Sequence, residues 1–250
     1  MEEREMLARF AAYYEGNWKK IYMALERHEN VPDVKISEKY ITVLDQQYPD
    51  RLRELECPPW VLFYRGDLSL LQGRKATVVG SREMSEYGRV TTGITVDILK
   101  KGMIIVSGLA KGVDAEAHAH ALCGGRTIGV IGHGMAIRYP AANAELYEQI
   151  EKHGLLISEF PYHTPIRKYH FPWRNRILAA LADIVIVTQA GVKSGTMHTV
   201  NAALELGREI YCIPYPFACE QGELCSQLIK EGAGILYNTE QIEDLLTGSP

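Results

Sequence analysis

The sequence predicts an α/β fold in which a mostly parallel sheet carries helices on both faces, preceded by a short N-terminal helical segment. Two patterns lead to this prediction. After Gly73, short apolar runs rich in valine and isoleucine alternate with longer helical stretches, as expected for a parallel sheet buried on both faces. Before residue 36, apolar residues recur at three- and four-residue steps instead, which is the period of a helix.

The N-terminal segment is predicted to be helical from residue 1 to about 33. The apolar residues at helical spacing are Leu7, Phe10, Tyr14, Trp18, Ile21 and Leu25. Gly16 is expected to interrupt the helix, and Pro32 is expected to end the segment.

Residues 36–75 are predicted to form an arm between this segment and the core. The run 48–55 suggests a short helix, which Pro58 and Pro59 would end. The run 60–66 then has the composition of a strand that stops at a glycine.

The core is predicted to span residues 76–246, so the chain divides into a segment 1–35 and a domain 36–250 that contains the arm and the core. The predicted strands are 76–80, 103–107, 127–132, 155–158, 183–187 and 209–213. The predicted helices are 86–101, 113–123, 142–153, 173–181, 196–206 and 224–231. In such folds ligands bind beyond the carboxyl ends of the strands, so the loops there should carry the function.

The bulk composition is that of a globular protein. The chain has 250 residues, a net charge of -4 and 46% hydrophobic residues, which excludes disordered and fibrous classes. A pI near 6.1 counts against a protein covered in positive charge, although it allows one basic groove. The acidic start and the lack of a long apolar run predict a cytoplasmic protein that does not enter a membrane.

The five cysteines are an odd number and dispersed, so we expect reduced thiols. Because there is no CxxC pair, Cys212, Cys219 and Cys225 are expected to pack in the core rather than to bind zinc. We expect no metal site either. His118 and His120 lie two residues apart on a predicted helix and therefore point in different directions, and Asp114 is expected to serve in capping or hydrogen bonding.

Several strand-end loops have the small and hydroxylated residues of a phosphate cradle. Glycines let the backbone approach a ligand closely, and the amides at a helix N-terminus attract phosphate oxygens. The cradle candidates are Ser81, Lys111, Ser194, Gly195 and Thr196. Neither the dinucleotide fingerprint GxGxxG nor a P-loop occurs, so we expect no nucleotide cofactor and no ATP hydrolysis.

The stretch 160–182 mixes cations with flat rings and contains no acid. Its cations are Arg167, Lys168, Arg174 and Arg176, and its main aromatic residues are Tyr162, Tyr169, Phe171 and Trp173. A helix is expected to start near Trp173, which would place the arginines in its first turn. Because cations oppose the helix dipole there, we expect them to meet an anion or an acidic group. Cations beside stacking rings are typical of sites for single-stranded nucleic acid.

Several ordered motifs between Tyr40 and Tyr237 resemble the DNA-processing protein A (DprA, or Smf) family. They are GSREMSEYG, SGLAKGVDAEAHAHAL, TIGVIGHGMAIRYPAANAELYEQI, LLISEFP, FPWRNRILAAL and SGTMHTVNAALELGREIYCIP. The resemblance implies an extended Rossmann-like fold, a cytoplasmic homodimer and binding of single-stranded DNA. It also implies that the protein is not an enzyme, and that it delivers incoming strands to the RecA recombinase in natural transformation.

The resemblance further implies which residues contact DNA. They are Arg82, Ser107, Gly108, Lys168, Phe171, Arg174, Asn175 and Arg176. The chain departs from the family pattern at Thr188-Gln189-Ala190, at Pro214-Tyr215 and at His198, which stands where an apolar residue is usual. The resemblance therefore does not determine which residues form the rim of the site.

Two alternatives remain on the same fold. One is a phosphoribohydrolase-like enzyme, whose motif PGGxGTxxE ends in a catalytic glutamate, but here Thr199 stands at that position and a hydroxyl cannot replace a carboxylate base. The other is a sensor that binds a small nucleotide in the same cradle. Such a sensor would not gain affinity with strand length.

Overall fold

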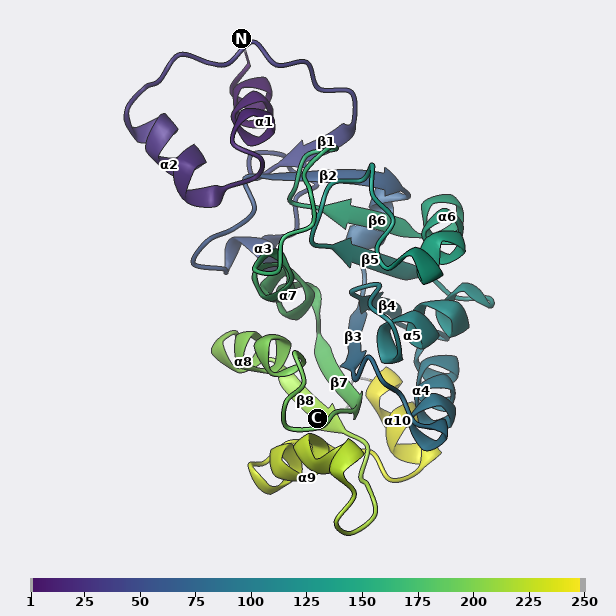
Figure 1. The fold of residues 1–250 in the computed structure, drawn as a ribbon. Helices are drawn as coiled ribbons and strands as arrows, with labels where there is room; N and C mark the ends of the chain where they lie inside the picture. Colours follow the sequence, from purple (N-terminus) through teal and green to yellow (C-terminus); the bar gives the residue numbers. More distant parts are fainter. Residues whose placement is uncertain (1, 248–250) are drawn as a thin grey trace.

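The structure is a computed structural model that describes residues 2–247, and within them nine strands form a single mixed sheet (Figure 1). Across the sheet the strands follow the order β1-β2-β6-β5-β4-β3-β7-β8-β9. The strands are β1 (Lys39–Thr42), β2 (Val61–Gly66), β3 (Lys75–Gly80), β4 (Ile104–Ser107), β5 (Thr127–Ile131), β6 (Leu155–Ser158), β7 (Ile184–Gln189), β8 (Glu209–Cys212) and β9 (Gly234–Ile235).

Helices connect these strands and cover the sheet. They are α1 (Glu3–Tyr13), α2 (Trp18–Glu26), α3 (Asp50–Arg53), α4 (Glu86–Leu99), α5 (Val113–Leu122), α6 (Ala144–His153), α7 (His170–Leu181), α8 (Met197–Glu205), α9 (Glu223–Lys230) and α10 (Thr239–Thr247). Short 3₁₀ turns occupy Leu68–Leu71, Ala141–Asn143 and Glu220–Gly222.

The sheet reverses its direction of growth at β3. From β3 the chain adds β4, β5 and β6 on one side, and it then returns to add β7, β8 and β9 on the other. All of these neighbours pair in parallel, whereas β1 and β2 join the β6 edge in antiparallel pairing. A reversal of strand order opens a crevice at the carboxyl ends of the central strands.

Side chains that alternate along the central strands build the two layers of the core. Ala76 and Val78 on β3 pack with the apolar residues of α4 and α5, whereas Val79 packs with those of α7 and α8. Figure 1 shows α4, α5 and α10 on one face of the sheet and α7 and α8 on the other. The predicted α/β sheet with helices on both faces is confirmed.

The N-terminal segment forms α1 and α2, and Gly16 interrupts it as predicted. Gly16 has a φ of +72°, and a Cβ there would come within 2.8 Å of the Glu159 carbonyl oxygen. The turn between α1 and α2 therefore packs closely against Glu159, the residue that follows β6. The division of the chain into 1–35 and 36–250 stays a prediction.

The six predicted core strands are all present, together with the predicted strand of the arm, which is β2. The predicted start of the helix near Trp173 is wrong, because α7 begins at His170. Pro172 does not prevent this, since it lies in the first turn, where a missing amide hydrogen costs no helical bond. Within residues 2–247 no helix is both long and apolar enough to cross a membrane.

Candidate functional site

A cavity of about 690 Å³ lies at the carboxyl ends of β3, β4 and β7, where the strand order reverses. The loops after β3 and β7 supply most of one wall, and the start of α7 supplies the other. The lining residues that carry polar or aromatic groups are Ser81, Arg82, Glu83, Asp114, Tyr139, Lys168, Phe171, Arg174, Asn175, Lys193, Ser194, Thr196, His198 and Thr199. The loops predicted to carry the function therefore do converge on one cavity.

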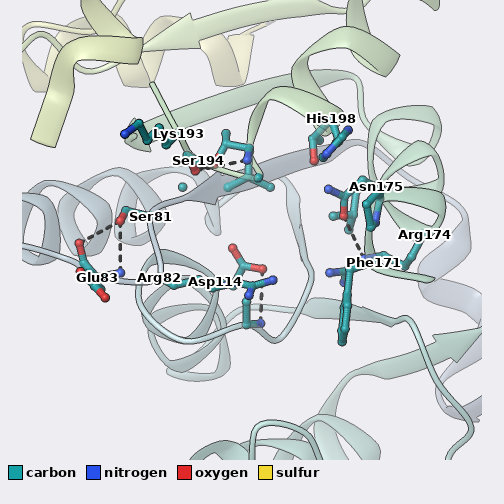
Figure 2. A pocket seen from close by; sticks show the side chains of 18 of the residues that line it. Ser81, Arg82, Glu83, Asp114, Phe171, Arg174, Asn175, Lys193, Ser194 and His198 are labelled. Atoms are coloured by element: carbon teal, nitrogen blue, oxygen red, sulfur yellow. Dashed lines mark hydrogen bonds between the residues drawn. The ribbon is translucent and has the colours of Figure 1, made fainter. Parts of the chain in front are cut away.

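Three exposed cations surround this cavity: Arg82, Lys168 and Lys193. In the described part of the chain, none of the three forms an ion pair. Figure 2 shows Lys193 across the cavity from Arg82. Although the chain has a net negative charge, the cavity offers cations to an anionic ligand.

A half-buried aromatic ring lies among these cations. Phe171, in the first turn of α7, lies beneath the guanidinium of Arg82, whose Cζ is 5.9 Å from the ring centroid. The ring of Tyr139 lies 5.8 Å from that of Phe171, centroid to centroid. A flat apolar surface beside unpaired cations can stack a base while the cations contact its phosphates.

Beneath the cavity, a buried network holds the loop that follows β4. The carboxylate of Asp114 accepts hydrogen bonds from the amides of Gly108 at 3.1 Å and Ala110 at 3.4 Å. Burial raises the pKa of Asp114, and the nearby positive charge of Arg174 opposes that rise. The expected hydrogen-bonding role of Asp114 is therefore confirmed.

Arg174 crosses from α7 to the same loop. Its guanidinium donates to the carbonyl oxygens of Gly108, at 2.8 Å, and Val130, and its Nε donates to Asn175. With only 5% of its surface exposed, Arg174 lines the cavity mainly as a strut that joins α7 to the strand ends.

A smaller cavity of about 190 Å³ adjoins the first and shares Phe171 and Tyr139 with it. The loop after β4 contributes Gly108 and the exposed Lys111 to its wall. The two cavities together form a continuous site around Phe171.

The loop before α8 is shaped by its own hydroxyl groups. The side chains of Ser194 and Thr196 lie within hydrogen-bond distance of each other at 2.7 Å, and the Ser194 hydroxyl also accepts the amide of Thr196 at 3.2 Å. Gly195 is exposed between them. Three of the five predicted cradle residues, Ser194, Gly195 and Thr196, thus form one turn on the wall of the larger cavity.

Two of the residues named from the sequence do not reach either cavity. Ser107 is fully buried, and its hydroxyl donates to the carbonyl oxygen of Val78 at 2.6 Å. Arg176 forms an ion pair with Glu159 at 2.7 Å and lies over the ring of Trp173 at 4.2 Å.

The prediction that Arg174 and Arg176 lie in the first turn of α7 is therefore wrong. Because α7 starts earlier than predicted, Arg174 and Arg176 lie in its second turn. The acids missing from 160–182 are supplied from outside it: Glu159 pairs with Arg176, and Glu15 pairs with Arg167 at 2.5 Å.

Lys193 and Tyr139 were not among the predicted site residues, yet both line the larger cavity. The signal for Lys193 was present in the sequence, since a cation directly precedes the cradle loop Ser194–Thr196. Tyr139 had no local signal because its position beside Phe171 depends on the long loop after β5. His198, whose role the sequence left open, also lines the cavity.

Residues 39–247 match the model of the family described as DNA recombination-mediator protein A. The chain belongs to this family. It is 40% identical over 223 residues to the DNA processing protein DprA of Bacillus subtilis, a match that covers 88% of this chain and 73% of the relative.

Two solved structures of DprA proteins share the fold. The DprA of Streptococcus pneumoniae superposes with a TM-score of 0.83 at 31% identity, covering 98% of this chain and 96% of the other. The DprA of Helicobacter pylori superposes with a TM-score of 0.77 at 29% identity, covering 87% of this chain and all of the other. The latter structure addresses the way that protein binds single-stranded DNA.

Proposed function

We propose that this member of the DprA family binds single-stranded DNA, without regard to base sequence, in the cavity around Phe171. One observation carries the proposal: three exposed cations, which form no ion pair among the described residues, surround a stacking face at the switch point of the sheet. The single-stranded DNA binding mode of the Helicobacter pylori relative supports the same ligand class.

In this proposal the cations and the ring contact different parts of the strand. Arg82, Lys168 and Lys193 neutralise phosphates, while Phe171 stacks against a base. Stacking contributes about 1 to 3 kcal/mol per base and does not distinguish one base from another. Sequence-tolerant binding follows from that division.

The surrounding loops hold the strand in place. The turn Ser194–Thr196 offers exposed backbone to a phosphate, and Ser81 lies on the same wall. Gly108 and Lys111 border the smaller cavity. Asn175 stands next to Arg174 on the side of α7 that faces the cavity (Figure 2).

Membership in a family of recombination mediators supports the rest of the proposal. The protein acts in the cytoplasm as a homodimer and transfers the bound strand to the RecA recombinase during natural transformation or recombination. Sedimentation of the purified chain tests the dimer. The rate of RecA filament growth on single strands, with and without the chain, tests the transfer.

Fluorescence anisotropy with oligo-dT of increasing length, compared with duplexes of equal length, tests DNA binding. Affinity should rise over several nucleotides of single strand. If three to five phosphates are neutralised, log K should fall against log salt with a slope of about -2 to -3.5, from about 0.7 per phosphate. An affinity that does not depend on salt would contradict the proposal.

We propose no catalytic activity at this site. Thr199, at the place of the glutamate in phosphoribohydrolases, is buried in the wall of the cavity, and the carboxylate of Asp114 is engaged with backbone amides. Formation of a base and a ribose phosphate from any nucleoside monophosphate, lost on Lys193→Ala, would establish the enzyme instead. Tight mononucleotide binding without a gain from longer strands would indicate the sensor.

A further inference from the structure

Three aromatic rings near the N-terminus form a stack. Trp18 on α2 stacks with Tyr22 one turn later, with centroids 5.5 Å apart and planes 7° apart, and it also stacks with Trp60 at 5.4 Å and 22°. Hydrogen bonds fix the two indoles: Trp18 donates to the Pro58 carbonyl at 2.8 Å, and Trp60 donates to the Trp18 carbonyl at 3.3 Å. The ring of Tyr22 is 43% exposed.

A row of side chains on α7 leads from the cavity toward this stack. Tyr169 follows the cavity residue Lys168 and is exposed, and Trp173 lies one helical turn further on, so both occupy one face of the helix. Arg176 lies over Trp173, and its Nε donates to the carbonyl of Cys57, next to the Pro58 that receives Trp18. Arg176 therefore links Trp173 to the segment that holds Trp18.

Cations accompany the rings. Lys19 and Lys20 are exposed in the first turn of α2, where positive charge opposes the helix dipole and where no acid is present. Within residues 2–247 neither lysine forms an ion pair. The two lysines do not stabilise α2 at this position, but they are placed where they can contact a phosphate.

Two of the acids beside this path are already paired. Glu15, in the turn before α2, pairs with Arg167, and Glu159 pairs with Arg176 while also accepting the indole of Trp173 at 2.8 Å. These two carboxylates therefore do not add free negative charge where a phosphate backbone would follow the path.

We propose that a long single strand leaves the cavity along α7 and stacks its bases on a second surface, the tryptophan row, formed by Trp173, Trp18, Trp60 and Tyr22. The row contains all three tryptophans of the chain. The inference rests on the proposed binding of single-stranded DNA in the cavity. It adds a contact on α2, an element that precedes the family match at residue 39.

The first test compares oligo-dT of about 6 nucleotides, which fills the cavity, with oligo-dT of about 30 nucleotides, which reaches the row. Tyr22→Ala should weaken the affinity for the long strand about tenfold and leave that for the short strand unchanged. The control is Tyr13→Ala, since Tyr13 on α1 is also exposed, at 58% against 43% for Tyr22, and among the aromatic rings of residues 2–247 it contacts Tyr14 alone. It should bind both strands like the wild type.

The second test uses the tryptophans as reporters. In Trp173→Phe only Trp18 and Trp60 remain, and their fluorescence should be quenched by the long strand but not by the short one. Unchanged fluorescence at saturating long strand, or unchanged long-strand affinity in Tyr22→Ala, would overturn the inference.

The two proposals fail in distinguishable ways. If the wild type does not bind even the short strand, the proposed function fails and this inference fails with it. If the short strand binds and Arg82→Ala weakens it, while Tyr22→Ala is silent on the long strand, only the tryptophan row is wrong.

Discussion

The cations around the cavity and the arginines of α7 are the same kind of residue in opposite circumstances. Arg82, Lys168 and Lys193 are exposed and have no acidic partner in the described part of the chain. Arg174 and Arg176 lie inside, bound to carbonyl oxygens and to Glu159. The cations of the first set are free to pair with a ligand, whereas those of the second set already pair with groups of the protein.

The number of basic residues in a stretch of sequence therefore does not equal the number of positive charges that a ligand will meet. A buried guanidinium must be paired because an unpaired charge away from water costs several kcal/mol. An exposed one remains in water at little cost until a ligand binds. The experiments below separate stabilising charges from binding charges.

The largest effect should come from Arg174→Met. The change keeps much of the side-chain volume but leaves two carbonyl oxygens and the buried Asp114 without their cation. The free energy of unfolding, measured by urea denaturation, should fall by about 3 to 5 kcal/mol. The control Arg82→Met should stay within about 0.5 kcal/mol of the wild type. If Arg174→Met folds and its affinity for DNA depends less on salt than that of the wild type, Arg174 also contacts the DNA.

Acidification should destabilise the folded protein through His118, which is fully buried on α5 and bonds to Thr127 at 2.7 Å. Burial lowers the pKa of His118 to about 3, while the unfolded chain titrates near 6.5. Stability from the neutral histidine is therefore present above pH 6.5 and is lost progressively as the pH falls toward 3.

Between pH 6.5 and 4.5 this loss should reach about 2 to 3 kcal/mol, since each unit is worth about 1.36 kcal/mol. The measurement is the urea midpoint of the wild type and of His118→Asn across that range. Parallel pH profiles for the two proteins would mean that His118 does not contribute.

On the binding side, Phe171→Ala should cost about 1 to 3 kcal/mol in affinity for oligo-dT because the stacking face is lost. The salt slope should stay near that of the wild type, since no cation is removed. Phe171→Tyr is the matched control and should keep most of the affinity. Wild-type affinity in Phe171→Ala would show that bases do not stack there.

The smallest effects should come from Arg82→Ala and Lys168→Ala. Each should reduce the magnitude of the salt slope by about 0.7, the value for one phosphate contact on a single strand. The same measurement on Lys230→Ala, an exposed lysine of α9 outside both cavities, gives the background. A slope unchanged from the wild type would place the phosphates elsewhere.

Much of the architecture followed from local patterns. Apolar runs located the six core strands because burial on both faces requires them, and glycines located the loops. The loops after β3 and β7 were expected at one site since the carboxyl ends of parallel strands share an edge. Arg82 follows β3, whereas Lys168 and Phe171 come from the segment between β6 and the first turn of α7, and all three line the same cavity.

The start of α7 was mispredicted because proline ends a helix in its interior but is accepted in its first turn. That shift of three residues moved Arg174 and Arg176 out of the helix N-terminus. A local rule therefore located the helix correctly and misplaced the charges on it.

By itself, the sequence determined the α/β fold, the family and the loops that carry the site, because each depends on spacing within a short window. Only the tertiary structure decided which cations are free. Glu159 precedes the basic stretch and Glu15 lies far before it, yet both reach its arginines in the folded chain. Charge pairing depends on distance in space, and a linear pattern does not contain that distance.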